Sequence, residues 1–268
     1  ADDNVSVGTL FVAGIIPGIL VAVAMCVVNA RVSKQRNYKG DGQTPSWPEI
    51  AHTTWKALPA ILLPVLILGG MRAGWFTPTE ASVVAVFYAL VCGKYIYRTL
   101  NWSAVPDILW RSSLLTASVL IIIGMSASFA WVLTIEGVPQ AVANWLTALQ
   151  LGPWSFLIAI NILLLLFGIF IEPLPGVMVL VPILAPVAAK LGVDPVHFAM
   201  IVIYNLTLGM ITPPVGGLLF VTSNVSRVPM SELTRELKPF LWAHGVVLVL
   251  LTFIPTFSTW LPQALGFK

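Results

Sequence analysis

The chain has 268 residues, of which 58% are hydrophobic and 9% are charged, and its formal net charge is +3. A soluble domain carries about 25% charged residues, so these charges are too few to give the chain a solvated surface, which excludes a soluble enzyme and a disordered chain. The sequence pI of about 9.0 does not indicate nucleic-acid binding, because the basic residues lie between apolar runs as topology signals. We therefore expect an all-α, polytopic membrane protein.

Six apolar runs are long enough to be membrane-spanning helices. A bilayer core about 30 Å thick needs roughly 20 apolar residues in a helix, and the runs are residues 7–30, 58–74, 79–97, 112–135, 198–226 and 240–260. Between the first two, residues 37–56 predict a linker and then a short helix along the membrane interface, with Trp47 and Trp55 at headgroup depth. Ala1 is not an initiator methionine and no cleavable leader follows it, so we expect Ala1 to mark a cut in a longer chain.

A further apolar stretch, residues 154–189, is too long for a single span and is interrupted by Glu172-Pro173-Leu174-Pro175. Lys and Arg accumulate on the cytoplasmic side of membrane proteins. If this stretch enters and returns on one side, every basic residue is cytoplasmic except Arg72, Lys190 and Lys268. A single crossing gives a weaker asymmetry. We therefore expect a re-entrant hairpin, although two full crossings joined by a tight turn would distribute the charges in the same way.

Paired prolines interrupt the helices at membrane depth in residues 168–175 and 209–216. Proline lacks an N–H and frees the carbonyl four residues earlier. The carbonyls predicted to be free are those of Ile169, Ile171, Gly209 and Met210. Unpaired carbonyls are costly in hydrocarbon, and hard cations prefer oxygen ligands. We therefore expect a Na⁺ site, with Ile169, Glu172, Gly209, Met210 and Thr212 as its predicted ligands.

The half-helices that begin after each break direct their positive dipole ends to one region, which suits an anionic substrate. The residues predicted to line this substrate cavity are Asn205, Pro213, Pro214 and Gly216. Structural interpretations stay open, because membrane prolines are often kinks, a carboxyl group at depth can be a hydrogen-bonded structural acid, and lone polar residues such as Asn205 and Thr207 often bridge helices. Glu80 is predicted to cap a helix that begins near Pro78.

Catalysis within the membrane is not indicated. The sequence has no HExxH or GxSxG motif and no pair of acids suited to general acid–base chemistry. Its three histidines are scattered along the chain without metal-ligand spacing. We expect no enzyme activity, no cofactor other than Na⁺ as a coupling ion, and no nucleic-acid partner.

Four motifs together resemble the large membrane subunit of tripartite ATP-independent periplasmic (TRAP) transporters. They are residues 10–18 (LFVAGIIPG), Gly69-Gly70, residues 74–81 (GWFTPTEA) and residues 208–216 (LGMITPPVG). The resemblance covers the whole chain. In that family the large subunit contains two inverted repeats, each with a re-entrant hairpin and a discontinuous helix. This chain resembles the last helix of the first repeat followed by the complete second repeat.

The resemblance implies a domain order. Residues 1–36 are the last helix of the first repeat, 37–56 the cytoplasmic linker and interfacial helix, and 57–150 the scaffold and connecting helices. Residues 151–268 are the transport domain, with a hairpin at 154–190, a discontinuous helix at 196–226 and a final helix at 238–260. By the same resemblance, the hairpin tip falls at 168–175 and the helix break at 209–216.

The resemblance also implies a Na⁺-driven importer of small organic acids that moves its transport domain as an elevator. The implied location is the bacterial inner membrane, with cytoplasmic basic loops and a periplasmic C-terminus. Implied partners are a periplasmic substrate-binding protein, a small membrane subunit, the missing first repeat and membrane lipid. Two alternatives remain: a stand-alone secondary anion transporter of the same broad fold, and a non-transporting scaffold whose prolines only kink helices. No Arg lies at depth to select a particular carboxylate.

Overall fold

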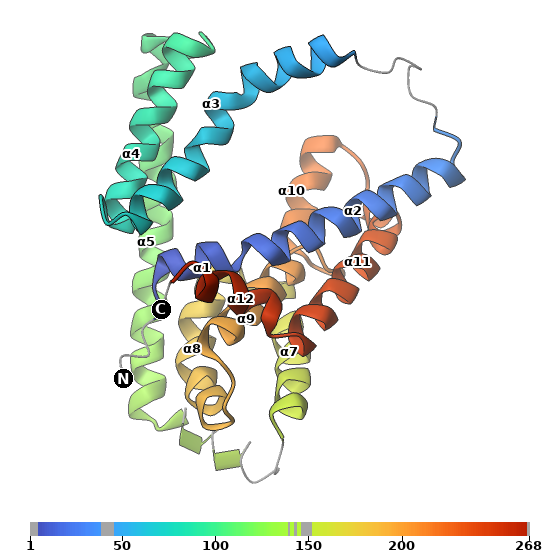
Figure 1. Ribbon diagram of the computed structural model, residues 1–268. Coiled ribbons are helices and arrows are strands. Elements are labelled where there is room, and N and C mark those ends of the chain that lie inside the picture. The colour runs from blue at the N-terminus through green and yellow to red at the C-terminus, as the bar shows by residue number, and fades with distance from the viewer. Residues whose placement is uncertain (1–4, 39–45, 139, 142–143, 146–151, 267–268) are drawn as a thin grey trace. The chain divides into compact units, whose positions relative to one another are not determined.

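The computed structural model describes residues 5–38, 46–138, 140–141, 144–145 and 152–266, and in this part of the chain helices are joined by turns and loops, without strands (Figure 1). Seven helical stretches within it are long and apolar enough to cross a membrane. The structure therefore confirms the prediction of an all-α, polytopic membrane protein. The chain divides into two compact units, one formed by Ala1–Val32 with Val119–Lys268 and the other by Ser33–Ser118.

The larger unit is organised around one central helix. Its helices are α1 (Val7–Ala13), most of α2 (Ile15–Gln35), the second half of α5 (Val105–Ile135), α7 (Pro153–Phe170), α8 (Pro173–Lys190), α9 (Pro195–Gly209), α10 (Gly217–Ser226), α11 (Met230–Phe253) and α12 (Thr256–Ala264). Helix α9 contacts α1, α7, α8, α11 and α12. The core lies where α7, α8 and α9 meet, with Phe156, Leu164, Ile201 and Leu206 fully buried in it. Helix α9 is therefore the element against which these five helices are positioned.

Local signals set the connection between α8 and α9. After α8 ends at Lys190, Gly192 adopts a φ of +74°, which reverses the chain and is accessible to glycine without a steric penalty. The Asp194 carboxylate then accepts hydrogen bonds from the backbone N–H groups of Val196 (2.9 Å) and His197 (3.0 Å), which caps α9. Because this connection is short, α8 and α9 remain neighbours.

Besides the turn at Gly14, which divides the predicted first span into α1 and α2, three further interruptions divide predicted apolar stretches of this unit. The first separates α7 from α8 at residues 171–172, and the second separates α9 from α10 at residues 210–216, both within segments that the sequence predicted to be broken. The third separates α11 from α12, where the sequence predicted one continuous final helix at 238–260. Ile254 there has φ −123° and ψ 83°, because the α conformation is disfavoured for a residue that precedes proline.

The smaller unit consists of α3 (Trp47–Arg72), α4 (Pro78–Val91), the π-helical turn η1 (Cys92–Ile96), the 3₁₀ turn η2 (Trp102–Ala104) and the first half of α5. Helix α3 is continuous, so the predicted interfacial helix and the span predicted to follow it are one element. The Glu49 carboxylate starts this helix by accepting a hydrogen bond from the Ser46 N–H at 2.8 Å. The predicted domain boundary at residue 150 lies outside the described residues.

The turn between α3 and α4 explains two of the sequence motifs. Thr77 Oγ1 accepts from the Glu80 N–H (3.3 Å), and the Glu80 carboxylate accepts from the Thr77 N–H (2.7 Å). This reciprocal pair is a capping box, which confirms the predicted capping role of Glu80. The ring of Phe76 lies against Gly70, where an added Cβ would come within 2.0 Å of it. Glycine at position 70 therefore makes room for the aromatic ring.

Candidate functional site

The two proline-containing breaks are held beside each other by a contact between glycine backbones. Helices α7 and α9 cross at Gly168 and Gly209, and a Cβ added to Gly209 would lie 2.4 Å from the carbonyl carbon of Gly168. A Cβ on Gly168 would lie 2.9 Å from the carbonyl oxygen of Leu206. Only glycine allows so close an approach. Since α7 ends at Phe170 and α9 at Gly209, the crossing places both breaks at one location.

The first break is a short extended turn. Ile171 has φ −118° and ψ 132°, Glu172 is the residue that precedes α8, and Pro173 opens that helix. Within the described residues no backbone N–H donates to the carbonyl of Ile169 or of Ile171, as the proline positions predicted. The Glu172 side chain is exposed, and its carboxylate has no hydrogen-bond partner in the part of the chain that the structure describes. The turn therefore presents two acceptor carbonyls and one carboxylate.

The second break corrects part of the sequence prediction. The Gly209 carbonyl accepts from the Thr212 N–H (2.9 Å), and the Met210 carbonyl accepts from the Leu218 N–H (3.1 Å). The prediction that both carbonyls are free is therefore wrong. The Gly209 carbonyl is bonded within the turn before the prolines, and the loop folds back so that an N–H from beyond the prolines reaches the Met210 carbonyl. Each oxygen keeps a second lone pair. The Thr212 hydroxyl donates to the Leu208 carbonyl at 2.8 Å and can still accept.

Gly216 closes the second break. Its φ of +47° lies in the left-handed region, and a Cβ there would lie 2.9 Å from the Met210 oxygen and 3.0 Å from the Thr212 carbonyl oxygen. Two backbone oxygens thus converge on this glycine. The predicted cavity residues Pro213 and Pro214 lie in the same loop, half-buried and exposed respectively. Helices α8 and α10 both begin at the breaks, with N-termini that favour negative charge.

Asn205 lies inside the helix interface. Its side chain is fully buried, and its Nδ2 donates to Asn161 Oδ1 on α7 at 2.6 Å and to the Ile201 carbonyl at 2.9 Å. It therefore bridges two helices, which was the structural interpretation left open for it. Its assignment to a substrate cavity stays a prediction. Asn161 in turn donates to Thr252 Oγ1 on α11 at 2.8 Å.

Sequence reasoning missed Asn161 and Thr252. The available signal was that Asn161 is a lone amide within the apolar run of α7, which is expensive unless it has a partner. The histidines were considered only as metal ligands. In the described residues, no group of three or more His, Cys, Asp or Glu side chains is arranged to hold a metal. His197 instead lies within hydrogen-bond reach of Ser258 Oγ (2.8 Å) and binds α9 to α12.

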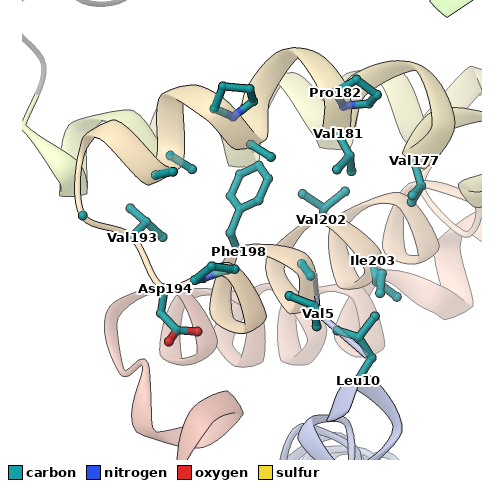
Figure 2. Close-up of a pocket in the computed structure, with 17 residues that line it drawn as sticks. Val5, Leu10, Val177, Val181, Pro182, Val193, Asp194, Phe198, Val202 and Ile203 are labelled. Carbon is teal, nitrogen blue, oxygen red and sulfur yellow. The ribbon is translucent and has the colours of Figure 1, made fainter. Parts of the chain in front are cut away.

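An apolar groove of about 930 Å³ lies on another side of α9. Figure 2 shows Val177, Val181 and Pro182 of α8 facing Phe198 and Val202 of α9 across it. Asp194 is its one acidic lining residue, and that carboxylate already caps α9. The groove offers apolar contact without ligands for an ion or a carboxylate, so it is separate in character from the two breaks.

The chain matches a family model described as the tripartite ATP-independent periplasmic transporter, DctM component, over residues 2–257. The chain belongs to this family. It is 41% identical over 271 residues to the C4-dicarboxylate TRAP transporter large permease protein DctM of Pseudomonas aeruginosa, an alignment that covers 99% of this chain and 62% of that protein. The chain therefore spans about three fifths of the length of this relative. Membership of the DctM family confirms the predicted resemblance.

Two further relatives broaden the comparison. A putative dicarboxylate transporter subunit of Paracoccus pantotrophus is 54% identical over 205 residues, 76% of this chain and 98% of that protein. The sialic acid TRAP transporter large permease protein SiaM of Vibrio cholerae is 39% identical over 260 residues, 97% of this chain and 61% of that protein. These DctM-family relatives are transporter subunits and not enzymes, which agrees with the prediction from sequence.

Proposed function

We propose that this chain is the part of a TRAP permease that forms one half of a Na⁺-coupled pathway for small organic acids. The observation that carries the proposal is the Gly168–Gly209 contact, which places two interrupted helices at one location. Interrupted helices at membrane depth are tolerated where they line a cavity or a site. Family membership supports transport as the activity.

The proposed Na⁺ ligands are oxygens at the two breaks. The Ile169 carbonyl has no backbone donor among the described residues, and the Thr212 hydroxyl and the carbonyls of Gly209 and Met210 keep lone pairs. Glu172 adds an exposed carboxylate at the turn. Oxygen donors of this kind suit a hard cation, and the cation would offset the charge of a bound acid.

The proposed substrate is a small carboxylate held by the N-termini of α8 and α10. Both helices begin at the breaks, and the positive ends of their dipoles favour an anion. Pro213, Pro214 and Gly216 form the loop before α10, and Asn205 is buried one turn before the end of α9. C4-dicarboxylates and sialic acids are the first substrates to test, because the names of relatives refer to them.

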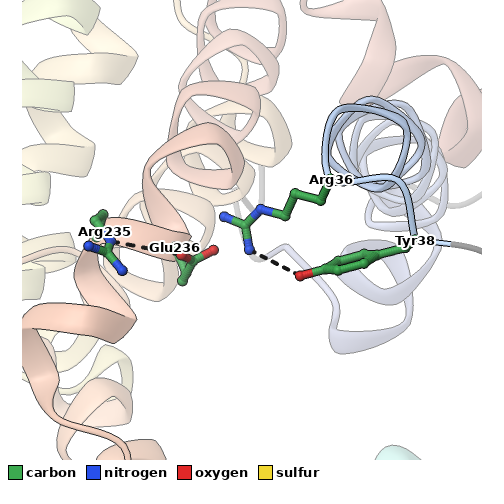
Figure 3. Close-up of polar contacts among 4 residues, drawn as sticks. All are labelled: Arg36, Tyr38, Arg235 and Glu236. Carbon is green, nitrogen blue, oxygen red and sulfur yellow. Dashed lines mark hydrogen bonds and ion pairs between the residues drawn. The ribbon is translucent and has the colours of Figure 1, made fainter.

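The proposed location is the bacterial inner membrane, with a periplasmic C-terminus. The C-terminal end of α2, the residues that follow it and the first turns of α11 carry basic side chains, which are typical of cytoplasmic segments. Figure 3 shows two of them with neighbours on their own segments: Arg36 Nη1 donates to Tyr38 Oη at 3.4 Å, and Arg235 Nε lies 3.9 Å from the Glu236 carboxylate. The α7–α8 hairpin would then be re-entrant and would move with α9 as an elevator.

The proposed partners follow from the tripartite family. A periplasmic binding protein would deliver the substrate, a small membrane subunit would enlarge the scaffold, and a first repeat of the same subunit would supply the other half of the cavity. The alternative is a stand-alone anion transporter, which would need no binding protein. Uptake measured with and without that protein separates the two.

The test is uptake of a radiolabelled C4-dicarboxylate by the full complex in proteoliposomes, with and without an inward Na⁺ gradient. We expect uptake to require the gradient, and uptake indifferent to Na⁺ would reject the coupling. Thr212→Val removes one proposed ligand and should raise the Na⁺ concentration for half-maximal uptake. Thr222→Val is the matched control, because that hydroxyl also donates to the carbonyl four residues earlier (2.8 Å) but lies on the exposed side of α10.

A further inference from the structure

We propose that Asn161 and Asn205 are positioning residues that set the register of α7 on α9, and thereby keep the two breaks beside each other. The proposal rests on the proposed function, since the breaks matter only if they form the transport site. The two asparagines lie outside the breaks and are not proposed to touch an ion or a substrate. They act through the helices that carry them.

The hydrogen bonds of this pair have a defined direction. Asn205 Nδ2 must face the Ile201 carbonyl, because a carbonyl accepts and cannot donate. The same nitrogen donates to Asn161 Oδ1, and Asn161 Nδ2 donates to Thr252 Oγ1, whose hydroxyl donates to the Leu248 carbonyl. Two of these bonds cross between helices, from Asn205 on α9 to Asn161 on α7 and from Asn161 to Thr252 on α11, and the other two stay within α9 and α11. The chain of bonds connects α9, α7 and α11 in a single arrangement.

The pair and the glycine contact act on the same two helices. Gly168 lies two turns beyond Asn161 on α7, and Gly209 lies one turn beyond Asn205 on α9. The two contacts follow the same order along both helices. Together they fix both the rotation and the axial position of α7 on α9.

The remainder of the interface does not select a register. The buried side chains that α7 presents to the core are Phe156, Leu157, Ile160 and Leu164. Apolar side chains of this kind pack at several offsets, and lipid provides little hydrophobic driving force between helices. A buried amide pair is specific, because a slipped helix would break the bond between Asn205 Nδ2 and Asn161 Oδ1 and leave that oxygen without its donor. Single buried asparagines set register in coiled coils for the same reason.

Asn205 also has an unfavourable effect on stability, which is not expected of a residue whose role is only to strengthen the helix interface. Its Oδ1 is buried and has no hydrogen-bond partner among the described residues. An apolar residue at this position would avoid that cost. Burial of Asn205 is therefore unfavourable for stability, yet the residue is paired with a second asparagine. This combination is typical of a residue that selects one helix register.

The experiment compares Asn161→Leu, Asn205→Leu and the double variant in the full-length permease with its partner subunits in proteoliposomes. The control is Tyr204→Phe, which removes the contact of Tyr204 with His244 Nδ1 (2.8 Å) from the neighbouring position on α9 but leaves the asparagine pair intact. Spin labels at Leu174→Cys and Leu218→Cys, both at exposed positions just after the breaks, report the distance between the breaks. Native cysteines, including Cys26 and Cys92, are replaced first.

Each single variant removes the bond between Asn205 Nδ2 and Asn161 Oδ1 and leaves the other amide without its partner on the facing helix, so it should lower the melting temperature and the uptake rate. The double variant removes both amides, and Thr252 keeps its bond to Leu248, so its melting temperature should return close to wild type. If the pair sets the register, the spin–spin distance distribution of the double variant broadens or gains a population displaced by about one turn, roughly 5 Å. Its uptake at saturating Na⁺ then stays at least tenfold below wild type.

The proposal is overturned if the double variant restores melting temperature, a single spin–spin distance and uptake together, since the pair would then be only a bridge. A failure of the proposed function is a different result, namely Na⁺-independent uptake by the wild type. The distance measurement does not depend on transport, so it decides the positioning role in either case. Single variants that fail to fold do not affect the comparison between the double variant and Tyr204→Phe.

Discussion

Replacing Gly209 with alanine should push α7 and α9 apart. The added Cβ would lie 2.4 Å from the carbonyl carbon of Gly168 and 2.5 Å from its Cα. Non-bonded carbon atoms are most stable about 3.5–4.0 Å apart, so the two backbones must separate by about 1 Å. Backbone atoms cannot rotate away as a side chain does. Overpacking of this kind costs about 1–3 kcal/mol, and the helix propensity of alanine offsets at most about 1 kcal/mol of it.

The assay is thermal unfolding of the purified permease, followed by tryptophan fluorescence, because this chain contributes 10 Trp residues. We expect Gly209→Ala to lower the melting temperature and to reduce uptake, since the breaks at the ends of α7 and α9 would move apart. Gly245→Ala is the control, because nothing lies within 4 Å of a Cβ at that position of α11. It should be neutral or slightly stabilising. A Gly209→Ala variant as stable and as active as Gly245→Ala would refute the close helix crossing.

Three other substitutions test separate parts of the structure. Gly216→Ala should abolish most uptake, because it combines a φ of +47° with a Cβ 2.9 Å from a carbonyl oxygen, whereas Gly217→Ala, with open space around it, should retain uptake. Gly70→Ala should lower the melting temperature, since the new Cβ would lie 2.0 Å from the Phe76 ring. Adding Phe76→Leu to this variant should recover part of the lost melting temperature, and no recovery would argue against the contact. Thr77→Ala should lower the free energy of unfolding by about 0.5–2 kcal/mol, because it removes a helix cap. Thr77→Ser keeps the hydroxyl and should lower it less in the same unfolding measurement; equal losses would show that the cap does not stabilise the helix.

Sequence alone was sufficient for features that depend on nearby residues. The low charge and the long apolar runs predicted a polytopic helical membrane protein, and the paired prolines predicted the interruptions after α7 and α9. Thr77 and Glu80 predicted their own capping box, because both partners lie within one helical turn. In each case the free-energy penalty depends on the local segment alone, because burying a charge in lipid and lacking the N–H of a proline are both costly whatever the rest of the chain does.

Some local features were still misjudged. Residues 47–56 and the following span form one helix, because no turn residue separates them and Pro59 and Pro64 are accommodated within α3. The break before Pro255 divides a run that was predicted to be continuous. A proline interior to an apolar run therefore does not by itself indicate whether the helix bends or continues, since neighbouring helices supply the compensating contacts.

The tertiary structure decided which distant residues meet. Helices α7 and α9 are separated in the sequence by α8. They are joined by the contact of Gly168 with Gly209 and by the bond between Asn161 and Asn205. The Leu218 N–H donates to the Met210 carbonyl and so replaces the bond that proline removes. This bond also depends on the tertiary structure, because the loop must fold back to bring Leu218 to Met210. Such contacts depend on the crossing of two helices, and apolar side chains permit several crossings. One crossing is selected because close glycine approach and paired amides are both satisfied in it.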